Sequence, residues 1–167
     1  FVKAQIPLLL SDPDVWCVFI NTEKFIDHER ALFLPSITQP EDKSNFIMTC
    51  DAMLHGRKRG ESFGLAHSEF LFHNRPVVAW EGGKDGNHRV MLRNAPGALY
   101  RDGDDFLAKA RGLRDNLDYD WAGIVAPFSP DAAMQKFQQV FVERAERPTG
   151  NRVFIDVGYR FRKIFRK

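Results

Sequence analysis

Short, mostly apolar runs recur along this chain, separated by segments with helical patterns, and this alternation limits its fold most. The runs lie near residues 15–20, 31–34, 52–55, 76–80 and 98–100. Residues such as Asn21, Pro35 and Gly56 end them. Runs that are apolar on both faces are typical of strands buried in a parallel sheet. We therefore predict an α/β fold, a Rossmann-like three-layer sandwich with a parallel sheet between two helical layers.

Helical segments are expected between and after these strands. They lie near residues 1–10, 40–50, 62–73, 104–114 and 129–147. Pro7 weakens the first of them, Asn74 suits a left-handed stop for the third, and Ser129 or Asp131 suits the cap of the last. Residues 115–130 show no clear pattern. We predict one domain over residues 1–150 and a basic tail over residues 151–167.

Charge and cysteine content narrow the class of protein. The net charge is +2, yet residues 158–167 alone carry five Lys and Arg and no acid, so the rest of the chain is mildly acidic. Such a body argues against nucleic acid as a partner. Cys17 and Cys50 are the only cysteines and form neither a disulfide framework nor a zinc pattern. We expect free thiols, and a cytoplasmic location.

The stretch from Gly56 to Val78 holds most of the functional information. Glu61 and Glu69 lie eight positions apart, around a predicted helix start at Phe63-Gly64-Leu65. At about 1.5 Å per residue they would lie roughly 12 Å apart along a helix axis, within reach of one nucleotide sugar. Before them, Arg57-Lys58-Arg59 between two glycines suits an anionic diphosphate, because unpaired amides at a helix start attract anions as well. A solvated basic turn is the alternative for this loop.

The two glutamates with seven residues between them, Phe63-Gly64 after the first, and the strand from Pro76 resemble the motif of retaining GT-B glycosyltransferases, in their C-terminal, donor-binding domain. The resemblance implies that Glu61 is catalytic and lies near the transferred sugar. It implies donor contacts through the backbone of Phe63, Gly64 and Leu65, and ribose binding by Glu69. It also places Pro35 near the base. Arg57 and Lys58 complete the expected donor site.

The same resemblance implies a nucleoside-diphosphate sugar as substrate, with no metal and no cofactor. Family members usually carry an Arg/Lys pair before the first helix and an acceptor-binding N-terminal domain, and neither is present in this sequence. We therefore expect a part of a longer enzyme that transfers no sugar alone. A non-catalytic nucleotide-sugar-binding or scaffolding module, or a sugar-nucleotide epimerase, stays open. Peripheral contact of the basic tail with a membrane also stays open, beside a solvated tail.

Overall fold

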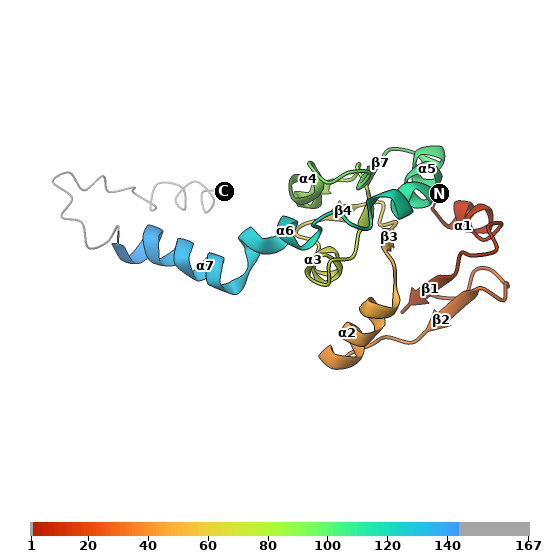
Figure 1. The fold of residues 1–167 in the computed structure, drawn as a ribbon, viewed down its shortest axis with the longest axis horizontal. Coiled ribbons are helices and arrows are strands. Elements are labelled where there is room, and N and C mark those ends of the chain that lie inside the picture. The colour runs from red at the N-terminus through yellow and green to blue at the C-terminus, as the bar shows by residue number, and fades with distance from the viewer. Residues whose placement is uncertain (1, 144–167) are drawn as a thin grey trace, which may run out of the picture. The chain divides into compact units, whose positions relative to one another are not determined.

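The strands form small parallel sheets, as the computed structural model of residues 2–143 shows (Figure 1). Strands β1 (Cys17–Ile20) and β2 (Ala31–Leu34) pair with each other. Strands β3 (Met53–His55), β5 (Val77–Trp80) and β7 (Leu99–Tyr100) follow the order β3-β5-β7. All of these pairings are parallel. Each of the five strands starts within two residues of its predicted position, so the sequence prediction of a parallel α/β fold is confirmed.

A third parallel sheet consists of β4 (Gly60–Glu61) paired with β6 (Asp85–Gly86). The sequence does not predict this pair, because two-residue strands made of Gly, Glu and Asp carry no hydrophobic pattern. In the structure it ties the loop after β3 to the loop after β5. Gly60 makes the pairing possible: it has φ +80°, and a Cβ there would collide with the carbonyl oxygen of Asp85.

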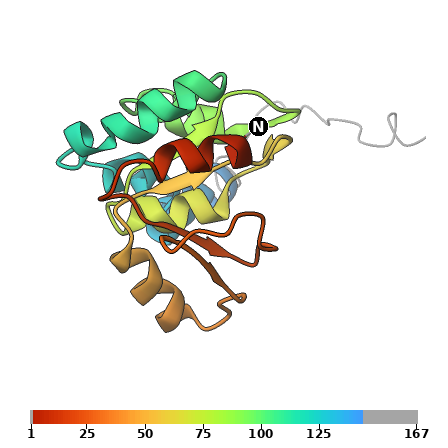
Figure 2. The ribbon, with the colours of Figure 1, turned by 90° about the vertical axis from the view of Figure 1, so that its right-hand side faces the viewer.

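Helices cover both faces of the three-stranded sheet β3-β5-β7, and the side chains of its middle strand, β5, show this most clearly. Val77 and Ala79 face one buried cluster, to which α2 (Pro40–Thr49), α3 (Leu65–Phe72), α4 (Asn87–Leu92) and α6 (Ala122–Val125) contribute. Val78 faces a second cluster built by α1 (Val2–Leu9) and α5 (Gly103–Arg111). Figure 2 shows α1 and α5 side by side. This is the expected Rossmann-like three-layer arrangement, although the sheets are small.

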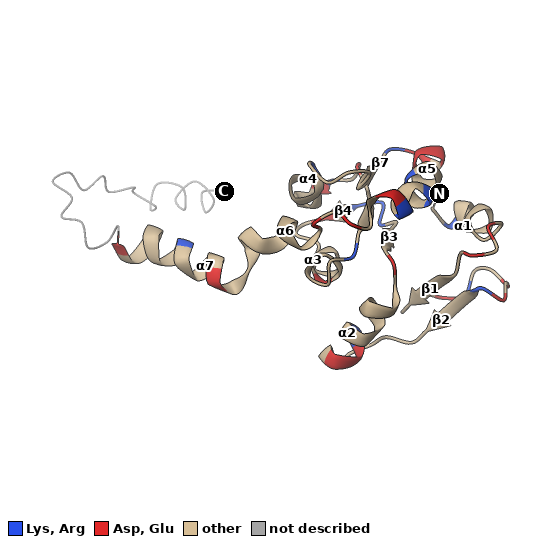
Figure 3. Cartoon of the chain, in the orientation of Figure 1, with Lys and Arg blue, Asp and Glu red and all other residues tan. Residues whose placement is uncertain are grey.

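The helix ends follow local sequence signals. Asn74 has φ +54°, as expected for the stop after α3. Asp102 caps α5, where its Oδ1 accepts a hydrogen bond of 2.8 Å from the amide of Asp105. Glu41 and Asp42 in the first turn of α2 place negative charge at a positive helix end, and Figure 3 shows the acidic residues there.

Residues 115–130, which the sequence left unassigned, form α6 and two short 3-10 turns over residues 112–116 and 126–128. Trp121 anchors them: it is fully buried, and its indole Nε1 donates a 2.9 Å hydrogen bond to the carbonyl of Asn116. The sequence of residues 115–130 has no helical periodicity, so it does not predict these short elements. Burial of Trp121, which depends on the rest of the fold, holds them in place.

The chain divides after Phe128 into two compact units. In the second unit, α7 (Pro130–Phe137) continues as a π-helical turn over Gln138–Val142. The predicted cap at Ser129 is confirmed, because its Oγ accepts a 3.2 Å hydrogen bond from the amide of Ala132. The predicted domain end at 150 and the basic tail 151–167 lie outside the described residues and stay predictions.

Candidate functional site

A pocket of about 360 Å³ lies at the start of α3. It is lined by His55, the last residue of β3, and by every residue from Glu61 to His67. In parallel α/β sheets, ligands bind beyond the carboxyl ends of the strands. The pocket therefore lies where the fold favours a binding site, and it includes four residues that the sequence singled out: Glu61, Phe63, Gly64 and Leu65.

Glu61 is held in a fixed position at this pocket. Its Oε1 accepts a 3.0 Å hydrogen bond from Nη1 of Arg57 and lies 3.2 Å from Nε2 of His55. The side chain is 19% exposed. His55 is in turn anchored through its carbonyl, which accepts a 2.9 Å hydrogen bond from the hydroxyl of Tyr100. Both contacts of the carboxylate use Oε1, so within the described residues Oε2 is left to accept hydrogen bonds from a ligand.

The basic loop is partly neutralised by the protein itself. Arg57 pairs with Glu61, and Nε of Arg59 lies 2.8 Å from Oδ2 of Asp85. Lys58 is exposed and forms no ion pair within residues 2–143. Of the three cations expected to face a diphosphate, Lys58 is thus the one whose charge is not already compensated nearby.

The first residues of α3 line the pocket. Gly64 is the N-cap, with φ +89°, ψ +61° and no side-chain cap. The first intrahelical bond runs from Ser68 N to Gly64 O over 3.0 Å, so the amides of residues 65–67 have no partner within the helix. The side chain of Phe63 packs edge-on against Phe128 at 5.7 Å between ring centroids. Leu65 is 72% exposed. The helix begins three residues later than predicted, because the left-handed Gly64 stands before it.

Three histidines from three elements, His55, His67 and His88, form a cluster beside Glu61. The ring of His67 lies 4.3 Å from that of His55, edge-on, and 5.8 Å from that of His88. His88 is fully engaged: Nδ1 accepts from the amide of Glu61 at 3.2 Å, and Nε2 donates to the carbonyl of Trp80 at 2.7 Å. It therefore fixes the backbone of Glu61 against the end of β5.

His67 contrasts with His88, because it is completely buried and neither of its ring nitrogens has a hydrogen-bonding partner in the described part of the chain. Burial, followed by the neighbouring imidazoles of His55 and His88, lowers its pKa to about 3. The ring is therefore neutral at pH 7. Burial also lowers the pKa of His55, although Glu61 opposes the shift.

Sequence alone favours surface or cap positions over metal ligation for His67 and His73. For His67 this expectation is wrong, because it lies on the buried face of α3 with Ser68, Phe70 and Leu71. His73 is a cap residue as expected, with Nδ1 2.8 Å from the carbonyl of Glu69. His55 and His88 were not predicted as site residues, and the available signal was position: His55 is the last residue of β3, and His88 lies in α4, after the loop that follows β5.

Four predicted site residues do not line the pocket: Arg57 and Lys58 of the basic loop, Glu69 and Pro35. Glu69 is half exposed on α3, and its Oε1 lies 2.9 Å from Nζ of Lys43 on α2. Glu61 belongs to β4, so the helical rise does not measure its separation from Glu69. Pro35 follows directly after β2, in the two-stranded sheet.

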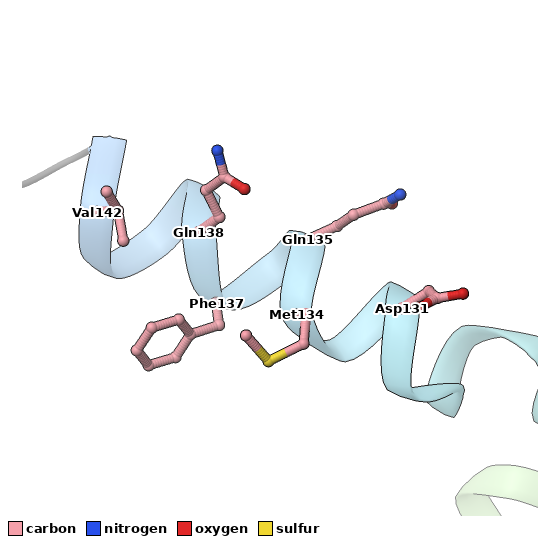
Figure 4. Close-up of a pocket in the computed structure, with 6 residues that line it drawn as sticks. All are labelled: Asp131, Met134, Gln135, Phe137, Gln138 and Val142. Atoms are coloured by element: carbon pink, nitrogen blue, oxygen red, sulfur yellow. The ribbon is translucent and has the colours of Figure 1, made fainter.

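A second hollow, of about 490 Å³, lies along α7 in the other unit (Figure 4). Its lining comes from a single helical segment, with Met134 and Phe137 pointing to one side and Asp131 and Gln135 to another. A ligand site is usually a cleft on which polar groups from several elements converge. The pocket at α3 meets this description better, and we regard it as the candidate site.

Within residues 2–143, His, Cys, Asp and Glu side chains do not form a group of three or more that could hold a metal ion. Cys17 and Cys50 are free, and burial raises the pKa of both thiols. Every helix in the same range is too short or too polar to cross a lipid bilayer. Chemistry without a metal ion and a cytoplasmic location of the chain therefore both stay predictions.

No protein-family model matches this chain, and the comparison with curated proteins finds no significant match.

Proposed function

We propose that this chain binds a nucleoside-diphosphate sugar at the start of α3, as the donor-binding part of a retaining glycosyltransferase. One observation carries the proposal: Glu61 and residues 65–67, whose amides have no partner within the helix, line one pocket at the carboxyl end of β3. A carboxylate accepts hydrogen bonds from sugar hydroxyls, and free helix-start amides donate to phosphate oxygens. A nucleotide sugar offers both groups a few bonds apart.

The chemistry follows from the charges. In transfer of a glycosyl group from a nucleotide, negative charge grows on the departing diphosphate, and donors that are already in place stabilise it. The amides of residues 65–67 and the ammonium of Lys58 supply such donors. Glu61 is held by Arg57 and His55, so it orients the sugar without having to be ordered first.

Glu69 is proposed to bind the ribose hydroxyls from outside the pocket itself. Its carboxylate is half exposed and paired with Lys43, so a ribose has to share it with that ammonium. Removing Lys43 therefore separates two effects: a ribose contact gains from a freer carboxylate, whereas a purely structural pair loses stability.

Calorimetry tests the proposal with UDP, GDP and ADP and with UDP-glucose, GDP-mannose and ADP-glucose. Glu61→Gln keeps the shape of the side chain and removes its charge. A charge-assisted hydrogen bond contributes about 1.5–3 kcal/mol, so we expect the affinity for the preferred nucleotide sugar to fall roughly ten- to a hundredfold. Glu41→Gln, on the first turn of α2, is the matched control and leaves affinity unchanged.

Absence of binding by all six ligands contradicts the proposal. Equal affinity of wild type and Glu61→Gln for the nucleotide sugar removes Glu61 from the site. Loss of binding in Glu41→Gln as well would show that the charge change acts on the whole domain rather than on the pocket.

A further inference from the structure

The unpartnered nitrogens of His67 need an explanation. Among the described residues, five buried side-chain nitrogen or oxygen atoms have no hydrogen-bonding partner, and three of them belong to His55 and His67. Both histidines line the pocket at α3. A buried polar group without a partner destabilises the folded state, and native proteins keep few of them. Their concentration at one pocket points to a ligand as the missing partner.

The protonation state of His67 identifies the ligand group. The neutral ring offers one N–H donor and one lone pair. A phosphate at neutral pH accepts hydrogen bonds and suits cationic donors, whereas a hydroxyl both donates and accepts. Glu61, which lies on the same pocket, is also an acceptor suited to hydroxyls. The side chains of His67 and Glu61 therefore suit the hydroxyls of a sugar ring better than a diphosphate.

The geometry places the ring directly behind the backbone of the pocket. The position that a Cβ would take on Gly64 lies 2.5 Å from Nδ1 of His67, and its three nearest atoms all belong to this ring. Glycine at residue 64 therefore lets the imidazole pack against the helix start, and both residues line the pocket. Both nitrogens are shielded from water, so contact with a ligand requires the ring to turn about its Cβ–Cγ bond, a torsion that is broad and soft.

We propose that His67 binds a hydroxyl of the transferred sugar and thereby sets the affinity for the nucleotide sugar above that for the bare nucleotide. This inference rests on the proposed function, because it assigns the sugar end of the same ligand. His67 is neither one of the two glutamates nor one of the residues 63–65 on which the sequence prediction of a donor site was built.

The variant His67→Phe removes both nitrogens and keeps a planar ring. The folded protein is expected to be at least as stable as wild type, because a phenyl ring leaves no desolvated nitrogen behind. The ratio of the dissociation constant of the nucleotide to that of its sugar conjugate is expected to fall about three- to tenfold, the effect of one neutral hydrogen bond. Affinity for the bare nucleotide stays the same.

His73→Phe is the matched control, since His73 ends the same helix with both ring nitrogens engaged, Nδ1 with the carbonyl of Glu69 and Nε2 with the hydroxyl of Ser44. It is expected to lower stability and to leave the ratio of the two dissociation constants unchanged. A residue with a purely structural role moves stability and not this ratio, so opposite responses of the two variants support a role of His67 in sugar binding.

A measurement on the wild-type protein keeps the test decisive if His67→Phe does not fold. With ¹³Cε1-labelled histidine, saturating nucleotide sugar is expected to shift the His67 signal, and saturating nucleotide is not. Equal shifts from both ligands, no shift from either, or an unchanged ratio in a folded His67→Phe would overturn the inference while nucleotide binding upholds the proposed function. If no ligand binds at all, both fail together.

Discussion

Replacing Gly64 with alanine tests the packing on which the candidate site depends. Gly64 has φ +89°, where a non-glycine residue costs roughly 1–2 kcal/mol. The added Cβ would also stand 2.5 Å from Nδ1 of the buried His67 ring, and overpacking of this kind costs about 1–3 kcal/mol. We therefore expect Gly64→Ala to lower the free energy of unfolding by about 2–5 kcal/mol.

Gly97 provides a matched control for the backbone cost. It has φ +68°, and a Cβ there would meet no heavy atom within 4 Å. Gly97→Ala is therefore expected to lower the free energy of unfolding by only about 1–2 kcal/mol. The difference between the two variants measures the contact with His67.

Urea unfolding at 25 °C, followed by the fluorescence of the tryptophans, gives these free energies, and the fully buried Trp121 reports on the unit that holds the site. A double-mutant cycle with His67→Ala is expected to recover about 1–3 kcal/mol, because removing the ring removes the clash. Equal costs for Gly64→Ala and Gly97→Ala, together with additive effects in the cycle, would refute the packing of His67 against Gly64.

Two further predictions concern pH and burial. His67 has a folded-state pKa of about 3 against an ordinary value of 6.5, so the unfolded chain binds a proton between these values that the folded chain does not. The free energy of unfolding is then expected to fall as the pH is lowered from about 6.5 toward 3, by up to about 1.4 kcal/mol per pH unit, and His55 adds in the same direction. His67→Phe is expected to flatten this slope. An equal slope in wild type and variant, measured by urea unfolding at several pH values, argues against a buried neutral ring. Leu71→Ala is expected to cost about 2–5 kcal/mol, and Leu65→Ala on the exposed side of the same helix less than about 0.5; similar costs in thermal or urea unfolding would show that α3 is rotated from the orientation described.

The sequence was sufficient for the parallel strands, because each is a run of apolar residues closed by a turn residue. It was insufficient where structure arises from backbone pairing or from short elements. The pair β4–β6 has no hydrophobic signal, and α4 spans only six residues, Asn87–Leu92, after a glycine-rich loop. Residues 115–130 are positioned by the burial of Trp121, which is a tertiary effect.

The candidate site was predictable only as far as it is continuous in sequence. Glu61 and Gly64 share the pocket because they lie only three positions apart. The histidine cluster draws His55, His67 and His88 from three elements, and only the fold brings them together. Glu69 was placed by helical spacing from Glu61, but that spacing does not apply, because Gly64 delays the helix and Glu61 belongs to a strand.

Backbone amide NMR during titration with the preferred nucleotide sugar tests the central claim most directly. If a nucleotide sugar binds at the start of α3, the largest shifts are expected at the amides of residues 61–67, in β6, which pairs with β4, and at His88, which accepts a hydrogen bond from the amide of Glu61. The amides of α7, in the other compact unit, serve as an internal reference and are expected to stay in place. Shifts centred on α7, or no saturable shift at residues 61–67 at millimolar ligand, would contradict this account of the site.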